Sequence, residues 1–375
     1  MRVNSLEFEN FRNLEKNKIF TDKNTNVIFG ENAQGKTNLL ECIWLFCGGH
    51  SFRGSAEKEL INFNEKFAKI KLEFTSQDRE QNAEIRYTGN KKEVFINGVK
   101  KKSGASLIEK FSCVVFSPEH LSLVKAGPGI RRKFLDGALC QQKLKYAKYF
   151  SKGRHTLQHL WNLIRRPKKR FWKDYWKHTK LQVTLEIWNE NLASFGAYII
   201  AERIKYAEKL KENAKFFHSG ISNDRETLDI EYVSTIKEIN VDNLEEIKEK
   251  FLAELNNKLK DDLYNGYTTV GPHRDDINIL INGMKAKNFG SQGQQRSAVL
   301  SLKLSEATVL SEILEEKPVL LLDDVLSELD SKRQDYLLNK IDGYQVFITC
   351  CEHNDKKQLQ DGKLFVVNQG RITEE

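Results

Sequence analysis

The feature that most constrains the fold is an apolar strand that leads directly into a glycine-containing loop and then a helix. Residues 26–29 (NVIF) form a short apolar run, residues 30–37 (GENAQGKT) follow it, and residues 38–46 have helical character. The loop matches the pattern G-x-x-x-x-G-K-[ST]. Its two glycines allow successive N–H groups to point into one concavity at a helix N-terminus. This order of elements predicts an α/β domain with a phosphate-binding loop.

The loop residues predict binding of ATP with Mg²⁺. Lys36 would supply a cation to the β- and γ-phosphates, and the Thr37 hydroxyl would be a ligand of Mg²⁺. A merely tight turn is the weaker alternative, because the flanking strand and helix are also in place. The expected nucleotide-binding residues are Gly30, Glu31, Asn32, Ala33, Gln34, Gly35, Lys36 and Thr37.

A second acidic element follows another apolar run. Residues 319–322 (VLLL) read as a buried strand that ends in Asp323 and Asp324. Mg²⁺ takes oxygen ligands, so we expect Asp323 to be the carboxylate on the metal side. We expect Asp324 to be catalytic, because it is placed to orient the attacking water or to accept its proton. Taken alone, two acids after a strand would more often be a solvated helix cap; beside a phosphate-binding loop they indicate a Walker B element.

A small turn opens a helix between these two motifs. Residues 289–296 (FGSQGQQR) place Ser291 at a helix start, where free N–H groups form a second anion site. Taken alone, this turn would be an ordinary N-cap. Together with the other motifs, Ser291, Gly293 and Gln294 resemble the signature motif of ABC ATPases, and residues 327–330 (SELD) resemble their D-loop. In the ABC arrangement this turn and the phosphate-binding loop of another chain face one γ-phosphate, which predicts an ATP-dependent homodimer with Ser291 as a catalytic residue.

The chain resembles the RecF family, the DNA-repair members of the ABC/SMC-like ATPases, over most of its length. The resemblance implies a slow ATPase that binds single-stranded, duplex or gapped DNA and, with RecR and RecO, helps place RecA at gaps. It also implies that Arg12 lies near the nucleotide, although a lone arginine after a strand is equally a surface charge. The matching stretches are residues 10–13, 30–37, 118–136, 270–276, 291–296 and 321–330.

Some positions depart from the family pattern. His120 stands where an acid is expected, and Ala126 stands where a glycine is expected. Cys350 occupies the position after a strand where ABC transporters carry a switch histidine, and His353 comes later. His353 is therefore a γ-phosphate sensor or a loop residue, and no glutamine stands out as a Q-loop residue.

Positive charge is concentrated in one segment. The chain has a net charge of +8, yet residues 141–180 hold thirteen Lys and Arg against one acid, Asp174, which makes this segment +12 and the remainder near −4. Such a concentration is typical of a polyanion-binding face. Its aromatic residues, among them Trp161, could stack on unpaired bases, but we favour a core stripe for them. The candidate DNA contacts are Arg165, Arg166, Lys168, Lys169 and Arg170, with Arg131 and Arg132, for which a solvated helix face is the favoured alternative.

Periodicity predicts one discontinuous α/β head that carries a helical insertion. Strand patterns dominate residues 1–116 and return in residues 267–375, whereas residues 117–266 are mainly helical. A hairpin is expected to turn at Asn97-Gly98. The fold class that follows is an ABC-type P-loop ATPase head, with a mixed sheet plus antiparallel strands and an inserted helical second lobe.

Composition excludes several classes of protein. No apolar run approaches the roughly 18 residues of a membrane helix, and the N-terminus lacks a secretory apolar region, so a cytoplasmic protein is expected. The six cysteines form no CxxC pair and are expected to be buried reduced thiols. The basic, aromatic insertion and the poor switch-histidine match weigh against an ABC-transporter subunit. A small-molecule P-loop kinase would not need residues 291–295, and a structural clamp in which ATP only holds a dimer closed remains open.

Overall fold

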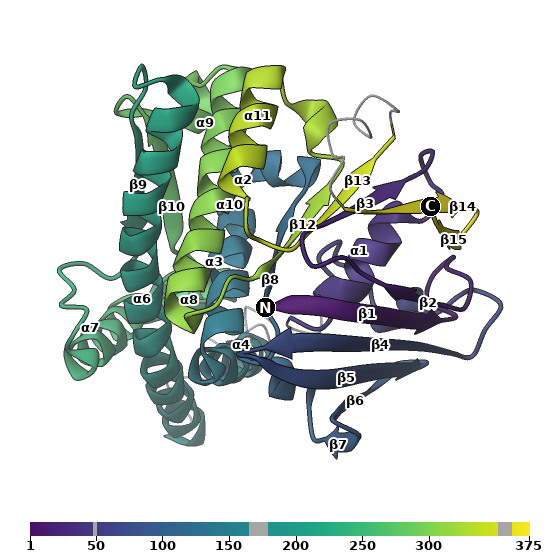
Figure 1. The fold of residues 1–375 in the computed structure, drawn as a ribbon. Coiled ribbons are helices and arrows are strands. Elements are labelled where there is room, and N and C mark those ends of the chain that lie inside the picture. Colours follow the sequence, from purple (N-terminus) through teal and green to yellow (C-terminus); the bar gives the residue numbers. More distant parts are fainter. Residues whose placement is uncertain (48–50, 165–178, 352–361) are drawn as a thin grey trace. The chain divides into compact units, whose positions relative to one another are not determined.

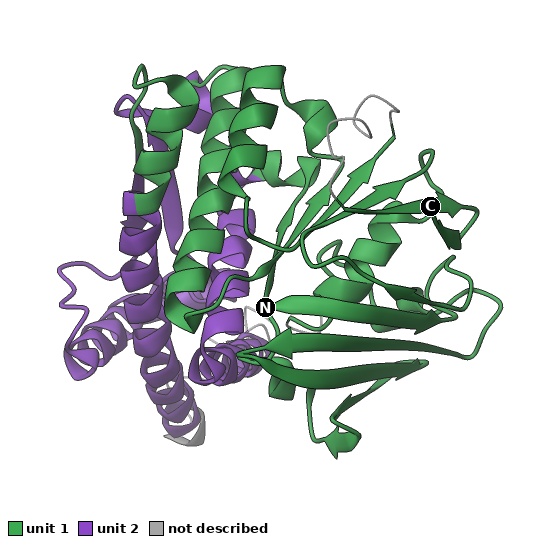
Figure 2. Ribbon diagram, in the orientation of Figure 1, with its two compact units in different colours: residues 1–122, 213–228, 290–375 green, residues 123–212, 229–289 purple. Residues whose placement is uncertain are grey.

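A computed structural model describes residues 1–47, 51–164, 179–351 and 362–375 (Figure 1). The chain divides into two compact units (Figure 2). Unit 1 comprises residues 1–122, 213–228 and 290–375, and unit 2 comprises residues 123–212 and 229–289. Unit 2 and the predicted helical lobe overlap without coinciding, because residues 267–289 pack in unit 2. The domain boundaries that periodicity suggests, after residues 116 and 266, stay a prediction.

A mainly parallel sheet forms the centre of unit 1. Its strand order is β15-β14-β3-β13-β12-β8, and only the β14–β15 pair is antiparallel. Segments from both ends of the chain therefore build one sheet, with β13 between β3 and β12. The strands are β3 (Thr25–Phe29), β8 (Cys113–Phe116), β12 (Val319–Asp323), β13 (Val346–Cys350), β14 (Lys363–Asn368) and β15 (Arg371–Glu374).

Strand β12 shows why the strands of this sheet have continuous apolar sequences. Its side chains alternate between two faces, and both faces are covered. Val319 and Leu321 join a core that includes helix α1 (Lys36–Trp44). Leu320 and Leu322 join a second core with helices α10 (Gln292–Leu314) and α11 (Ser331–Lys340). Every position of the strand is therefore buried.

A second sheet of unit 1 is antiparallel, with the order β2-β1-β4-β5-β6-β7. Its inward side chains, such as Leu6 and Ile70, share the core of helix α1. The β6–β7 hairpin turns at Asn97 and Gly98, whose φ angles are 50° and 76°, which confirms the predicted turn. The strands are β1 (Arg2–Glu9), β2 (Asn17–Phe20), β4 (Phe67–Ser76), β5 (Arg79–Thr88), β6 (Lys91–Ile96) and β7 (Val99–Lys101).

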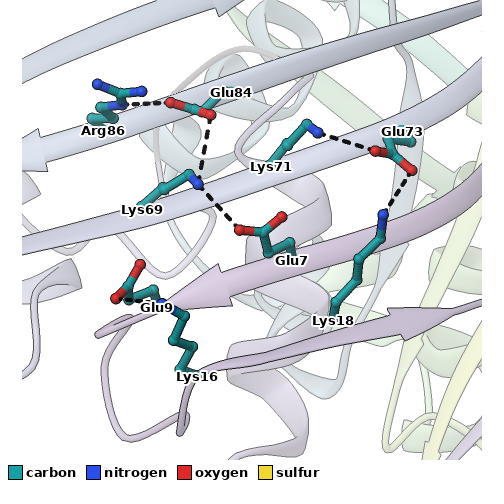
Figure 3. A network of polar contacts seen from close by, with 9 residues as sticks. All are labelled: Glu7, Glu9, Lys16, Lys18, Lys69, Lys71, Glu73, Glu84 and Arg86. Carbon is teal, nitrogen blue, oxygen red and sulfur yellow. Dashed lines mark hydrogen bonds and ion pairs between the residues drawn. The ribbon is translucent and has the colours of Figure 1, made fainter.

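The other face of this sheet carries ion pairs within and between its strands (Figure 3). Lys69 Nζ lies 3.1 Å from Glu7, and Glu73 lies 3.0 Å from Lys71 Nζ and 3.1 Å from Lys18 Nζ. Lys69 and Glu7 lie on the adjacent strands β4 and β1, where opposite charges stabilise a sheet modestly and favour one register. The hydroxyl of Ser5, followed by the two lysines, lowers the pKa of Glu73 to about 2.

Unit 2 is mainly helical and contains most of the long helix α6. The strand pattern after residue 276, which we expected in the ATPase head, forms a separate sheet with the order β11-β10-β9. Sequence periodicity does not specify this pairing, because the partner strand is remote in the chain. The elements are α3 (Pro128–Gln142), α4 (Leu144–Ile164), α6 (Thr179–Ser222), β9 (Leu228–Val233), α7 (Leu244–Asn257), α8 (Leu259–Asn265), β10 (Asp276–Ile281) and β11 (Met284–Lys285).

The lowered pKa of Glu73 predicts a pH-dependent contribution to stability. The folded state favours the charged carboxylate, so the stabilisation is present above about pH 4.5 and is lost as the pH falls towards about 2. Glu73→Gln should lower the free energy of unfolding by about 1 kcal/mol or less at neutral pH, since the pairs are partly exposed. Urea denaturation from about pH 7 to about pH 3 should show the difference shrinking.

Glu9→Gln is the matched control, because Glu9 pairs with Lys16, whose side chain is 67% exposed. The assignment is wrong if both substitutions give the same small, pH-independent change.

Candidate functional site

The predicted phosphate-binding loop connects β3 to α1. Helix α1 begins at Lys36, and its N-cap Gly35 has a φ of 120°. A Cβ atom at Gly35 would lie 2.9 Å from Asn13 Oδ1, and one at Gly30 would lie 2.4 Å from the Val367 carbonyl oxygen. Both glycines are therefore required by close neighbours, and Gly35 also by its backbone conformation.

The Lys36 ammonium points back onto its own loop. The residue is 7% exposed, and Nζ donates hydrogen bonds to the carbonyl oxygens of Gly30 at 2.5 Å and Glu31 at 2.9 Å. Its third neighbour is Cys351 Sγ at 3.0 Å, and this thiol also contacts Asn32 Oδ1 at 3.0 Å. Lys36 is thus held inside the concavity that the loop forms.

Thr37, Asp323 and Thr349 meet at the carboxyl edge of the parallel sheet. The hydroxyls of Thr37 and Thr349 donate to Asp323 Oδ1 at 2.9 Å and 3.0 Å. The cause is the strand order, since β13 pairs with β12 so that Thr349 lies beside Asp323. Burial raises the pKa of Asp323, and the two hydroxyls oppose that shift. A buried carboxylate beside a hydroxyl is a suitable oxygen pair for Mg²⁺, whose charge would offset the cost of burial.

Asp324 is held differently from Asp323. Its backbone has a φ of 52°, and its N–H donates to Thr349 Oγ1 at 2.8 Å. The Ser327 hydroxyl donates to the Asp324 carboxylate at 3.1 Å. The two carboxylates therefore have different hydroxyl partners, although Thr349 contacts both residues.

Arg12 lies next to this loop but already has a carboxylate partner. Its Nε and Nη2 donate to the two oxygens of Glu41, at 2.5 Å and 3.0 Å, and Glu41 on α1 is fully buried. The neighbouring Asn13 donates to the Gln34 carbonyl oxygen at 3.1 Å. Contact between Arg12 and a nucleotide stays a prediction, and Glu41 fixes the guanidinium from which such a contact would be made.

The predicted signature turn caps helix α10. Ser291 Oγ accepts from the Gln294 N–H at 3.2 Å, and Gln294 Oε1 accepts from the Ser291 N–H at 2.8 Å, which together form a capping box. Gln294 also donates to Glu226 at 2.9 Å, and Arg333 donates to the Gly293 carbonyl oxygen at 3.3 Å. Ser291 is exposed at the start of a 23-residue helix.

Arg131 differs from the solvated-face interpretation made for it, whereas DNA contact by Arg131 and Arg132 stays a prediction. Arg131 is 6% exposed and forms a two-point ion pair with Asp276, at 2.7 Å and 2.8 Å. Arg132 donates to the Asp275 carbonyl oxygen at 2.7 Å. Arg131 therefore lies on no solvated face, and its guanidinium is used inside unit 2, because a buried charge needs a partner.

The remaining predicted DNA contacts and His353 lie outside the described residues. Of the aromatic residues in the basic segment, Trp161 packs against the core of unit 2, and its indole donates to Thr268 Oγ1 at 3.1 Å. This position fits the core-stripe interpretation.

Sequence reasoning missed Thr349, Cys351, Glu41 and Asn13. Thr349 was within a predicted strand, but its neighbours depend on strand order, which periodicity does not give. Cys351 is half-buried, as is Cys140, whereas the other four cysteines are buried as expected.

None of the helices in the described ranges combines the length and the apolar character that a bilayer crossing requires.

Comparisons with known proteins identify the family of this chain. A family model described as RecF/RecN/SMC N terminal domain matches residues 2–373. The DNA replication and repair protein RecF of Clostridium acetobutylicum is 39% identical over 378 residues, which cover 100% of both chains. The RecF of Caldanaerobacter subterraneus subsp. tengcongensis is 40% identical over 379 residues, again covering 100% of both.

Solved structures give the same result. The recombination mediator protein RecF-ATP of the RecFOR pathway has a TM-score of 0.90 at 39% identity, covering 100% of this chain and 97% of that chain. The Smc head domain of Pyrococcus furiosus has a TM-score of 0.55 at 16% identity, covering 100% of this chain and 96% of that one, and shows a shared fold alone. The chain has the fold of a RecF/SMC-type ABC ATPase head and belongs to the RecF family of DNA replication and repair proteins.

Proposed function

We propose that this protein is a DNA-binding ATPase of recombinational repair that works as an ATP-gated dimer. It would help place RecA on gapped or single-stranded DNA together with RecR and RecO. The observation that carries the proposal is the junction of Thr37, Asp323 and Thr349 beside Lys36, which has the side chains that MgATP requires. Membership of the RecF family, and similarity to an ATP-bound RecF that is a recombination mediator, support the assignment to recombination.

The loop would bind ATP through its backbone and Lys36. The N–H groups at the start of α1 attract phosphate oxygens, and Lys36 would exchange its two carbonyl partners and Cys351 for those oxygens. Thr37 and Asp323 would hold Mg²⁺, which neutralises charge on the β- and γ-phosphates when bound.

Asp324 is the residue that we propose to act on water. Its carboxylate would orient the attacking water or accept its proton, as the second acid of a Walker B element. The Ser327 hydroxyl lies 2.9 Å from the Asp324 carbonyl oxygen and 3.1 Å from its carboxylate, which keeps further acceptor sites for water.

The signature turn is proposed to complete the site of a partner chain. Ser291 is exposed at the N-terminus of a long helix, where the helix dipole favours an anion. Two-fold symmetry would then build two sites, each with the loop of one chain and Ser291, Gly293 and Gln294 of the other. ATP binding and dimer closure would be one linked equilibrium.

Sedimentation with and without MgATP tests this linkage. ATP should convert the wild type from monomer to dimer. Lys36→Ala should stay monomeric, because it lacks the ammonium that binds the phosphates. Ser291→Arg should bind ATP and also stay monomeric, because the larger, charged side chain blocks the approach of the turn to the partner's phosphate. Asp324→Asn should bind ATP normally, hydrolyse it more slowly and therefore accumulate as the dimer.

Nucleotide affinity measured on the same variants separates the two causes of a monomer. If Ser291→Arg dimerises with ATP as readily as the wild type, the two-chain site is refuted. If Lys36→Ala binds ATP with wild-type affinity, the phosphate-binding loop is misassigned.

The basic segment predicts salt-dependent DNA binding. Replacing Arg165, Arg166, Lys168, Lys169 and Arg170 by glutamine should weaken DNA binding. It should also flatten the dependence of affinity on salt by roughly 0.7 to 0.9 log units of slope for each phosphate that is no longer neutralised. Fluorescence anisotropy at several salt concentrations measures both quantities.

The control removes five exposed lysines of unit 1 and so makes the same change in net charge: Lys16, Lys23, Lys66, Lys91 and Lys100. A fall in affinity with an unchanged salt slope, or an equal effect of the control, would show that the segment does not contact DNA phosphates.

A further inference from the structure

Two histidines on helix α4 bring their imidazole nitrogens together. His155 and His159 are four residues apart, which places them on the same face of a helix. Their Nε2 atoms are 3.1 Å apart, and both residues are exposed. Two histidines at this spacing on one helix face are a recurring way to bind zinc. We propose that His155 and His159 form a two-ligand site for a divalent transition metal of the Zn²⁺, Cu²⁺ or Ni²⁺ class.

The nitrogen separation fits such an ion with little movement. With metal–nitrogen bonds of about 2.0 to 2.1 Å, two ligand nitrogens lie about 3.3 Å apart in tetrahedral geometry and about 2.9 Å apart at a right angle. The value of 3.1 Å lies between these limits. Neutral imidazole is a good ligand for each of these metals.

Neighbouring residues hold one ring in place and offer further oxygen ligands. The His159 ring stacks on Trp188 of helix α6, with ring centroids 5.2 Å apart and planes 8° apart. This contact orients the imidazole before any ion binds. His155 lines a surface hollow of unit 2 together with Ser151 and Asn191, whose oxygens, with water, are suited to the remaining positions. The ion would join His155 and His159 across one turn of α4. It would also hold the His159 ring in its stacked position on Trp188.

Two features limit the affinity of this site. The described residues contain no group of three or more His, Cys, Asp or Glu side chains that could hold a metal, so the ion has two strong protein ligands and open positions. Lys152 lines the same hollow and repels a cation. We therefore expect an ion that binds more weakly than in a closed structural site and exchanges with solvent.

A competing explanation is a proton shared between the two rings, which gives the same nitrogen separation. The two explanations differ in what they predict for added metal. Only the metal site predicts uptake of one ion that depends on both histidines.

The experiment uses the full chain after removal of metals with EDTA. Titration calorimetry with zinc chloride should detect one ion per chain that His155→Gln and His159→Gln each weaken at least ten-fold. Copper(II) bound to the wild type should show, by electron paramagnetic resonance, splitting from two imidazole nitrogens. Zinc should also raise the midpoint of thermal unfolding of the wild type more than that of either variant.

A matched control keeps the number of histidines constant. His159→Gln combined with Asn162→His moves the second imidazole to a position seven residues from His155, about 10 Å along the helix, where one ion cannot reach both rings. This double variant should bind zinc as weakly as His159→Gln. The proposal is overturned if either single variant or the double variant binds zinc as tightly as the wild type, or if the copper spectrum shows fewer than two nitrogens.

Discussion

The pair of hydrogen bonds that Thr37 and Thr349 donate to Asp323 is the contact around which the candidate site is built. It joins three segments that are remote in the sequence: the start of helix α1, the end of β12 and the end of β13. Burial of the charged Asp323 carboxylate is unfavourable, and the two hydroxyls offset part of this free-energy cost. The offset is incomplete, because the pKa of Asp323 remains raised. A cation bound beside Asp323 would offset the rest of this cost. The junction of Thr37, Asp323 and Thr349 is therefore suited to a metal ion.

The position of the Thr37, Asp323 and Thr349 junction depends on the central sheet. Both faces of β12 are covered, so the strand and the acids that end it are held by two cores. Helix α1 carries Lys36 and Thr37 at its start and Glu41 one turn later, and Glu41 holds Arg12 against the loop. The same helix thus links the phosphate-binding loop to the antiparallel sheet. Packing, rather than the loop alone, keeps the site in place.

Local patterns were sufficient for the loop and the acidic strand. A glycine that needs a positive φ, a lysine and a hydroxyl at fixed spacing can be recognised from residues 30–37, and the hairpin at Asn97-Gly98 follows from turn chemistry. Strand order could not be predicted, because pairing joins residues far apart in the chain. This is why Thr349 was missed and why the pairing of β10 with β9 was not predicted. Arg131 was misread for a similar reason, since its partner Asp276 is 145 residues away.

The most direct test of this account measures metal binding at the junction of Thr37, Asp323 and Thr349. Electron paramagnetic resonance can follow Mn²⁺, a substitute for Mg²⁺, in the presence of ATP. Thr37→Val keeps the shape of the side chain and removes the hydroxyl that lies beside Asp323. The account predicts that the wild type binds one Mn²⁺ per chain with ATP and that Thr37→Val weakens this binding at least ten-fold while still binding ATP without metal. Unchanged Mn²⁺ affinity in Thr37→Val would contradict it.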